Sequence, residues 1–358
     1  MNTHELPMIL FTVIAQLSVG TFIALGIIDL ALARTHNKQT VARITRPVLY
    51  AIGPTLILGL VVSMLHMNDV FHVFNVIRHW DSSWLTREIL FGITFAGLGF
   101  GFAFLEWFQL GSELLRRLLG GLTALIGIGL IWSMSMIYYT LVTIPAWNTP
   151  IVPFHFFMTT AILGSLAVGC ALMFTVWIRK RNERKLATGP AEPAGTDEPV
   201  SGGRATAVAT ATAAKPTTTK QPVLGLVKDR INQINAPTTA EEWTLITRVV
   251  QWLAVATAVA GLLVLISYPL HISALATGNE AAQEAAGVFS GTFFVVRLVL
   301  LALSTGLLAL FVFKTAGQTL RERPQVLTWL ITAAFILAVV AEIMGRSLHY
   351  DSMFRIGI

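Results

Sequence analysis

The chain has 358 residues, of which 54% are hydrophobic and only 12% are charged. Because soluble domains carry about a quarter charged residues, this composition excludes an ordinary soluble enzyme and indicates a membrane protein. The net charge of +6 is not gathered into a basic stripe with interleaved aromatic residues, so nucleic acid is not an expected partner and the lipid bilayer is.

Eight segments are apolar over the roughly 20 residues that a helix needs to cross a bilayer. We therefore predict an all-α polytopic membrane protein with eight transmembrane helices. The first apolar run, Met8 to Leu32, is longer than the roughly 7–15 residues of a signal-peptide core, so we expect a span rather than a cleaved leader. The predicted spans are residues 8–33, 46–67, 87–109, 117–143, 154–178, 248–271, 289–313 and 326–346.

Basic residues alternate from one connection to the next along these spans. Lys and Arg mark the connections after spans one, three, five and seven, whereas the remaining connections are neutral or acidic. Since cytoplasmic loops carry the excess of Lys and Arg, the alternation predicts that both termini lie outside. The basic residues are Arg34, Lys38, Arg43, Arg46, Arg116, Arg117, Arg179, Lys180, Arg181, Arg184, Lys185, Lys314, Arg321 and Arg323.

A long connection at residues 180–247 separates spans one to five, within 1–179, from spans six to eight, within 248–358. Residues 186–222 are rich in Ala, Thr, Pro and Gly and lack apolar periodicity. Such a segment buries too little apolar surface to offset the entropy of ordering it. We therefore expect a largely disordered cytoplasmic linker.

Two local patterns follow this linker. Apolar residues recur at helical spacing from Val223 to Ile234, which predicts a short amphipathic helix on the inner membrane surface. The stretch Thr239-Ala-Glu-Glu242 has the spacing of a capping box, in which the Thr and Glu side chains each satisfy the other residue's backbone amide. We expect it to open the approach to span six.

Two ionisable groups lie where span two ends and span three begins. Span two ends at His66, and Glu88 falls in the first turn of the predicted span three. Both would lie near the outer edge of the hydrocarbon, where ionisable residues are costly and by default mark a site or a pathway. A histidine that titrates near neutrality and a partly desolvated carboxylate suit the two proton transfers of quinol oxidation. The alternative is that both only satisfy helix ends.

A second group of charges lies in spans seven and eight. Glu342 and Arg346 have i,i+4 spacing, which places them on one helix face where they can neutralise each other. Arg297 lies at a comparable depth in span seven. One interpretation is a structural network that ties the two spans together. The other is that these three residues line a quinone cavity.

The sequence bears on cofactors as well. The single cysteine, Cys170, cannot supply the four thiolates usual for an iron–sulfur cluster, so any cluster must belong to a partner. The histidines nearest membrane depth, His66, His155 and His271, all lie near the outer edge. A pair of stacked haems is therefore excluded, whereas a single haem near that edge stays open.

Several short motifs resemble the membrane-anchor subunit of the dimethyl sulfoxide reductase family. They are Ser63-Met-Leu-His66, the pair Phe74-Asn75, and the pattern S-x-L-x-x-E-I that ends at Ile89. The resemblance continues through Thr143-Ile-Pro-Ala-Trp147, and then to Arg297 and the Glu-x-x-x-Arg pattern of span eight.

The resemblance implies a haem-free anchor in the cytoplasmic membrane of a bacterium or archaeon. Such an anchor oxidises menaquinol and passes electrons to an iron–sulfur subunit, and thence to a molybdopterin catalytic subunit, both docked on the outer face. By matched position, the resemblance implies that His66 takes part in quinol binding and oxidation and that Glu88 is the acidic residue beside it.

Other functions stay open on the sequence alone. A secondary transporter would use intramembrane charges to bind substrate, but the chain has no inverted repeat and no corresponding pair of broken spans. A purely structural anchor without a quinone site would tolerate the loss of His66. A polysulfide reductase-type anchor would share the quinone chemistry but not the Ser63-to-His66 motif.

Overall fold

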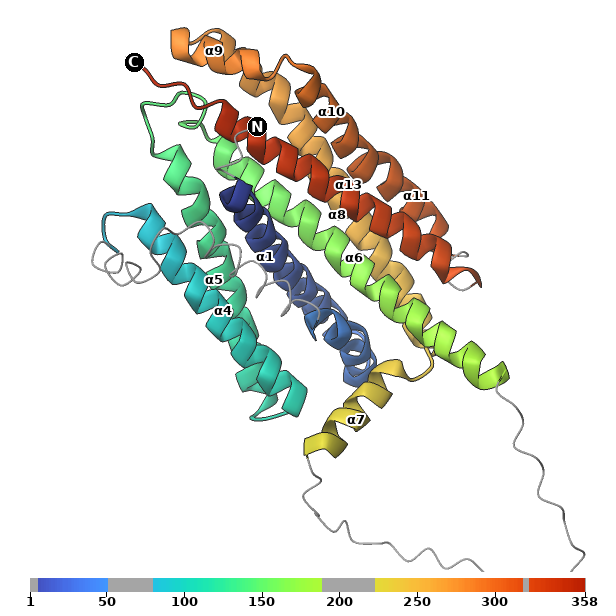
Figure 1. The fold of residues 1–358 in the computed structure, drawn as a ribbon. Coiled ribbons are helices and arrows are strands. Elements are labelled where there is room, and N and C mark those ends of the chain that lie inside the picture. Colours follow the sequence, from blue (N-terminus) through green and yellow to red (C-terminus); the bar gives the residue numbers. More distant parts are fainter. Residues whose placement is uncertain (1–5, 51–79, 189–222, 318–321, 358) are drawn as a thin grey trace, which may run out of the picture. The chain divides into compact units, whose positions relative to one another are not determined.

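A computed structural model describes residues 6–50, 80–188, 223–317 and 322–357. Regular structure in these ranges is entirely helical, which confirms the predicted all-α class there. The elements are α1 (Leu6–Ala33), α4 (Trp84–Phe108), α5 (Glu113–Tyr139), α6 (Ile151–Thr188), α7 (Val223–Asn235), α8 (Ala240–Ala276), α9 (Glu280–Val288), α10 (Thr292–Leu301), the π-helix η4 (Ala302–Leu307), α11 (Leu308–Thr315) and α13 (Pro324–Asp351) (Figure 1).

Within the described ranges, seven helices are long and apolar enough to cross a membrane. They match seven of the eight predicted spans, with α10, η4 and α11 together forming span seven. Residues 38–50 are helical and lead into the predicted second span, the rest of which lies outside the described residues. The chain is therefore a multi-pass membrane protein, and the count of eight stays a prediction.

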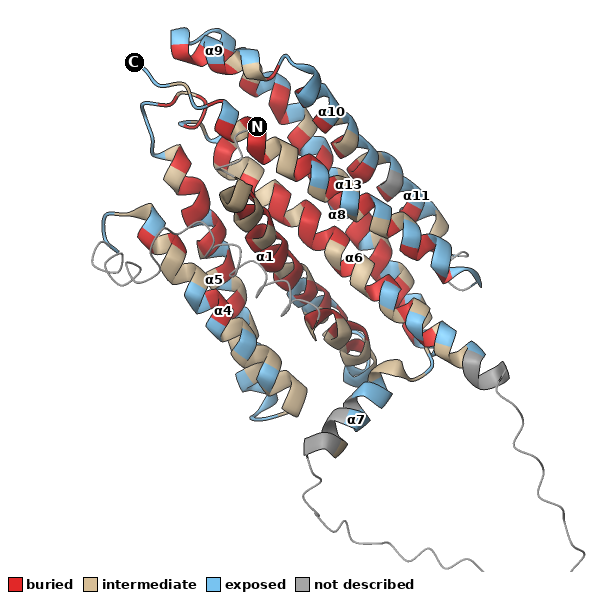
Figure 2. Cartoon of the chain, in the orientation of Figure 1, coloured by how far each residue is buried: buried red, intermediate tan, exposed pale blue. Residues whose placement is uncertain are grey.

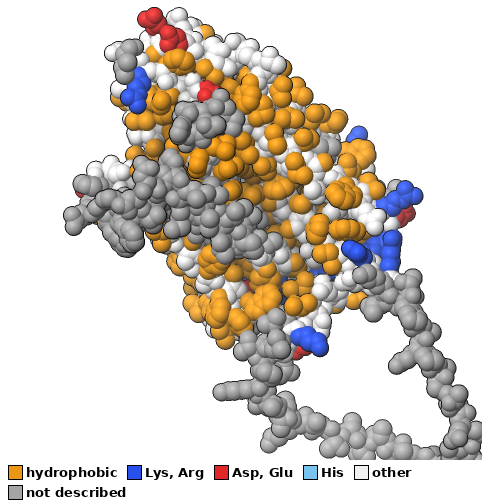
Figure 3. Space-filling model, viewed as in Figure 1, with side chains coloured by type: hydrophobic (Ala, Val, Ile, Leu, Met, Phe, Trp, Pro, Cys, Tyr) orange, Lys and Arg blue, Asp and Glu red, His pale blue; other side chains and the backbone are white. Residues whose placement is uncertain are grey.

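The chain divides into two compact units, one of Met1–Trp177 with Thr238–Ile358 and the other of Ile178–Pro237. In the first unit α4 pairs with α5, α1 packs on α5 and α13, and α13 also packs on α10. Buried residues follow the helix faces that meet inside this unit (Figure 2). Hydrophobic side chains dominate the visible outer surface, as expected for helices that face lipid (Figure 3).

Glycines let two pairs of helices in the first unit approach closely. A Cβ atom on Gly164 of α6 would overlap the backbone of Gly20 in α1. Likewise, a Cβ on Gly261 of α8 would overlap the Thr305 side chain in η4. Small residues at such crossings are the usual means by which membrane helices gain close packing, because lipid supplies no hydrophobic drive between them.

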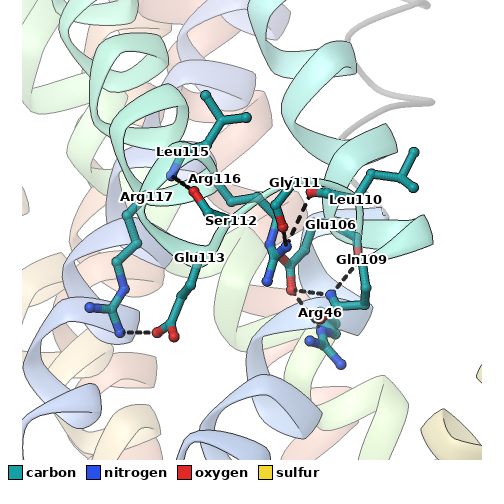
Figure 4. A network of polar contacts seen from close by, with 10 residues as sticks. All are labelled: Arg46, Glu106, Gln109, Leu110, Gly111, Ser112, Glu113, Leu115, Arg116 and Arg117. Carbon is teal, nitrogen blue, oxygen red and sulfur yellow. Dashed lines mark hydrogen bonds and ion pairs between the residues drawn. The ribbon is translucent and has the colours of Figure 1, made fainter.

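A network of ion pairs lies where α4 ends and α5 begins (Figure 4). The Glu106 carboxylate accepts from Arg46 Nε and from Arg116 Nε, each at 2.9 Å. Glu113, in the first turn of α5, pairs with Arg117 one turn later at 2.6 Å. These contacts join the 38–50 helix to the α4–α5 hairpin on the side that the charge pattern predicts to be cytoplasmic.

The predicted capping box is confirmed at the start of α8. The Thr239 hydroxyl accepts from the Glu242 amide at 3.3 Å, and the Glu242 carboxylate accepts from the Thr239 amide at 3.0 Å. Glu242 is also paired with Arg43 at 2.8 Å, so the same carboxylate joins α8 to the 38–50 helix.

In the second unit, α7 confirms the helix predicted from the spacing of apolar residues after Val223. Arg179 Nε, near the C-terminal end of α6, donates to the Ile234 carbonyl in the last turn of α7 at 2.6 Å. Residues 189–222, most of the predicted linker, lie outside the described residues. The placement of α7 on the membrane surface stays a prediction.

Candidate functional site

His66, the first of the predicted site residues, lies outside the described residues. Of the predicted site residues, the structure describes Glu88 and the three charges in spans seven and eight.

Glu88 lies one turn inside α4 and not in its first turn, which corrects the sequence-based placement. The helix begins at Trp84, earlier than predicted, because the Ser83 hydroxyl accepts from the Thr86 amide at 3.3 Å and caps the helix. Glu88 is consequently not the capping group. Its side chain is buried, and its carboxylate takes part in none of the hydrogen bonds or ion pairs found between described residues.

Two buried tyrosine hydroxyls meet between α5 and α13. The Tyr138 hydroxyl in the last turn of α5 is 2.6 Å from the Tyr350 hydroxyl at the end of α13, and both residues are buried. The ring of His349 stacks on Trp147 at 5.0 Å and meets the edge of Tyr138 at 4.8 Å, which fixes the pair in place.

Arg346 ties α13 to α1 and α6. Its Nη2 donates to Gln16 Oε1 at 3.0 Å, and Gln16 Nε2 in turn donates to the Phe156 carbonyl at 3.0 Å. The guanidinium also lies 3.7 Å from the centre of the Phe156 ring, a cation–π contact that is strong when both groups are out of water. Arg346 is thus held by two helices other than its own.

Glu342 does not pair with Arg346, although the two have i,i+4 spacing, so this expectation is wrong. Glu342 Oε2 accepts from the Thr159 hydroxyl of α6 at 2.7 Å, and the pair with Arg346 does not occur among the ion pairs of the described residues. Each charge finds a partner on a facing helix instead. Glu342 Oε1 is buried and has no hydrogen-bond partner among the residues that the structure describes.

Arg297 joins α10 to α13 through a backbone carbonyl and not through Glu342. Its Nε donates to the Ala341 carbonyl at 3.3 Å, and its guanidinium lies 4.6 Å from the centre of the Tyr268 ring. The guanidinium fits against α13 only because residue 345 is a glycine, whose Cβ would lie 2.5 Å from Arg297 Nε. Arg297 Nη1 is buried, and it too has no hydrogen-bond partner within the described ranges.

The remaining histidines of this region have protein partners. His155 Nε2 lies 2.6 Å from the Ser267 hydroxyl, and its ring packs on Tyr268 at 4.8 Å. His271 packs against Phe289 at 5.6 Å. In the part of the sequence that the structure describes, no three His, Cys, Asp or Glu side chains are grouped so as to hold a metal ion.

A separate cavity of about 20 Å³ lies between α6, α8, α11 and α13. Its lining is apolar apart from Ser165 and Thr257. A space of this size holds about one water molecule, which is far less than a quinone ring needs. The cavity is therefore not the candidate site.

Three polar contacts of α13 form a polar belt in the first unit. They are the Tyr138–Tyr350 pair with α5, the Arg346–Gln16 hydrogen bond with α1 and the Thr159–Glu342 hydrogen bond with α6. Sequence reasoning missed Gln16, because a lone polar residue in an apolar run has no local partner. It also missed His349, although 342, 346 and 349 share one helix face and could have signalled it.

Comparison with known proteins decides the family. The family model described as DMSO reductase anchor subunit (DmsC) matches residues 1–187, more than half of the sequence. The protein belongs to the DMSO reductase anchor subunit family. This confirms the resemblance inferred from the motifs around His66 and Glu88. The family match includes the positions of both residues and ends before Arg297, Glu342 and Arg346.

Individual relatives agree with this assignment. The sequence is 29% identical over 178 residues to one chain of the anaerobic dimethyl sulfoxide reductase of Haemophilus influenzae, which covers 48% of this sequence and 61% of the relative. It is 30% identical over 166 residues to the like-named chain of Escherichia coli, covering 46% and 56%. One subunit of the sulfite dehydrogenase of Allochromatium vinosum is 28% identical over 130 residues, covering 32% and 40%. The matches therefore span less than two thirds of each relative's length.

Proposed function

We propose that this protein is the haem-free anchor subunit of a molybdopterin oxidoreductase complex of the dimethyl sulfoxide reductase type, and that it oxidises menaquinol. The observation that carries the proposal is Glu88, a buried carboxylate with no partner among the described residues, inside the family-matched part of the sequence. Burying a carboxylate at that depth costs free energy, and such a residue by default indicates a functional site.

In this proposal the quinol gives up two electrons and two protons. His66 accepts one hydroxyl proton and Glu88 accepts the other, because both side chains are bases that can take up and release a proton near neutral pH in a partly desolvated setting. The electrons leave one at a time to an iron–sulfur subunit, which passes them to a molybdopterin catalytic subunit. Both partners dock on the outer face, and the complex lies in the cytoplasmic membrane of a bacterium or archaeon.

Arg297, Glu342 and Arg346 form the polar wall of the pocket in this proposal. Among the described residues, Arg297 Nη1 is a donor without a partner and Glu342 Oε1 an acceptor without one, and both are buried. A buried polar atom without a partner costs about 1–3 kcal/mol, so a quinone oxygen or a water that meets it is favoured. Arg346 is already bound to Gln16 and therefore acts through its charge.

The test is quinol-driven reduction of the partner's iron–sulfur clusters in membranes that carry the assembled complex. We expect His66→Ala and Glu88→Gln each to lower the rate by roughly 100-fold or more, in the range typical for loss of a positioned proton-transfer group. An artificial donor that reduces the clusters directly should work equally well in both variants and the wild type, which controls for assembly. Quinol-driven rates close to those of the wild type in both variants would instead indicate a purely structural anchor without a quinone site.

A further inference from the structure

Two hydroxyl groups line the small cavity between α6, α8, α11 and α13. Thr257 of α8 and Ser165 of α6 supply them, and the rest of the lining is apolar. Both side chains are buried, Thr257 completely. The Thr257 hydroxyl has no hydrogen-bond partner among the residues that the structure describes. An unsatisfied hydroxyl therefore lies at the wall of a cavity that a second hydroxyl also lines.

Thr257 differs in this respect from other threonines in the membrane helices. A threonine inside a helix can donate its hydroxyl hydrogen to the carbonyl four residues earlier. The hydroxyls of Thr21, Thr160 and Thr247 do so, at 2.6, 2.8 and 2.9 Å. The Thr257 hydroxyl makes no such bond to its own helix. Because a buried hydroxyl without a partner costs free energy, a hydrogen-bonding group inside the cavity would be favoured.

Two contacts fix how α6 and α8 are aligned. His155 Nε2 in α6 lies 2.6 Å from Ser267 Oγ in α8. Further along, a Cβ on Gly169 of α6 would lie 3.9 Å from Leu253 Cδ1 of α8. Residue numbers rise along α6 while they fall along α8, so the two helices run antiparallel. Gly169 follows His155 by fourteen residues and Leu253 precedes Ser267 by fourteen, so the alignment is the same at both contacts.

This alignment places Ser165 opposite Thr257. Ser165 follows His155 by ten residues, and Thr257 precedes Ser267 by ten. The two hydroxyls therefore lie at one level, near the middle of the predicted spans 154–178 and 248–271. The cavity of about 20 Å³ exceeds the roughly 10–15 Å³ that one water molecule needs, and two hydroxyls are the minimum number of polar partners for such a water.

We propose that this cavity binds one water molecule, which joins Thr257 of α8 to Ser165 of α6. The Thr257 hydroxyl donates to the water oxygen, and the water donates to the Ser165 oxygen. Nearly all of α6 belongs to the family-matched part of the sequence, whereas α8 follows it. The water is thus a polar link between the matched part and the later spans, at a depth where lipid supplies no hydrophobic drive between helices. This site is separate from the proposed quinol pocket and does not depend on it.

The first test is a density map of the assembled wild-type complex in lipid nanodiscs, obtained by electron cryomicroscopy at a resolution that shows ordered water. We expect one peak in the cavity, within hydrogen-bond distance of the Thr257 and Ser165 hydroxyl oxygens. An empty cavity in a map that shows other buried waters would overturn the proposal. A direct hydrogen bond between the two hydroxyls would overturn it as well.

The second test is the midpoint of thermal unfolding of Thr257→Val, which keeps the shape of the side chain and removes its hydroxyl. We expect the midpoint to fall by roughly 1–3 °C, because the water loses one of its two partners. Thr247→Val is the matched control in α8, since the Thr247 hydroxyl donates to the Trp243 carbonyl of its own helix. In a dry cavity Thr257→Val would only remove an unsatisfied polar atom. A midpoint equal to or above that of the control would therefore contradict the bound water.

Combining Thr257→Val with Ser165→Ala shows whether the two hydroxyls share one ligand. Because either change disrupts the same water, we expect the double variant to lose little more than the larger of the two single losses. Fully additive losses would show that the hydroxyls act independently. The wild-type density map keeps the proposal testable should a variant fail to assemble.

Discussion

At the scale of single residues, Glu342 and Arg346 are held by other helices and not by each other. Glu342 and Arg346 show why the expectation from spacing was wrong. The i,i+4 attraction is worth only about 0.2–0.5 kcal/mol on an exposed helix surface. Inside a helix bundle, leaving a buried polar atom without a hydrogen bond costs more free energy than this attraction provides. Each charge therefore binds a polar group on a facing helix, Thr159 for Glu342 and Gln16 for Arg346.

Gly345 provides a test of this arrangement. We expect Gly345→Ala to destabilise the protein by about 1–3 kcal/mol, because the new methyl group displaces the Arg297 guanidinium from the Ala341 carbonyl and from Tyr268. The measurement is the midpoint of thermal unfolding of the detergent-purified complex. Gly97→Ala in α4 is the control, since a Cβ there meets nothing within 4 Å. An unchanged or higher midpoint in Gly345→Ala would show that Arg297 adapts without loss.

The sequence singles out charges that have no local explanation. Glu88 and Arg297 are conspicuous in apolar runs, and both are buried. Tyr138 and Gln16 were not found, because tyrosine and glutamine are cheaper in a membrane helix and their partners lie 212 and 330 positions away. Sequence spacing reveals contacts within a helix, whereas these contacts cross between helices.

At the scale of helices, hydropathy located the spans and local chemistry set their ends. Ser83 starts α4 before the apolar run begins, and Thr239 with Glu242 starts α8 well before the predicted span at residue 248. The boundaries could be improved by giving such caps more weight than hydropathy. The π-helix in span seven has no comparable signal in the sequence, and its Thr305 lies against Gly261 of α8, a contact between helices that local spacing does not reveal.

The crossing of α1 and α6 is the element-scale feature most sensitive to a single atom. In Gly164→Ala the new methyl group would overlap the backbone of Gly20, which cannot rotate away as a side chain can. We expect a loss of at least about 3 kcal/mol, the upper end of the usual cost of overpacking, and a lower yield of folded complex. Gly169→Ala on the same helix is the control, because its Cβ would be in ordinary contact with Ile331 at 3.5 Å. Equal thermal midpoints for the two variants would contradict the close crossing.

At the scale of the whole molecule, the family match covers only part of the candidate site. The match ends at residue 187, so it includes Glu88 and the α4–α5 hairpin. The polar belt nevertheless depends on α13, because Tyr350 and Arg346 both come from that helix. The proposed quinol chemistry therefore requires the later spans to be packed against the matched half, which the contacts of α13 with α1 provide.

The loop charges predict the orientation of this molecule in the membrane, and the prediction can be tested with its single cysteine removed. In a Cys170→Ala background we would place one new cysteine at an exposed position, either Glu284→Cys in α9 or Leu114→Cys in α5. Because Lys and Arg are retained on the cytoplasmic side, a membrane-impermeant maleimide should label the Glu284 position in intact cells and the Leu114 position only after lysis. The reverse pattern would place the Glu88 end of the bundle inside the cell, and the partner subunits proposed for the outer face would then have to dock in the cytoplasm.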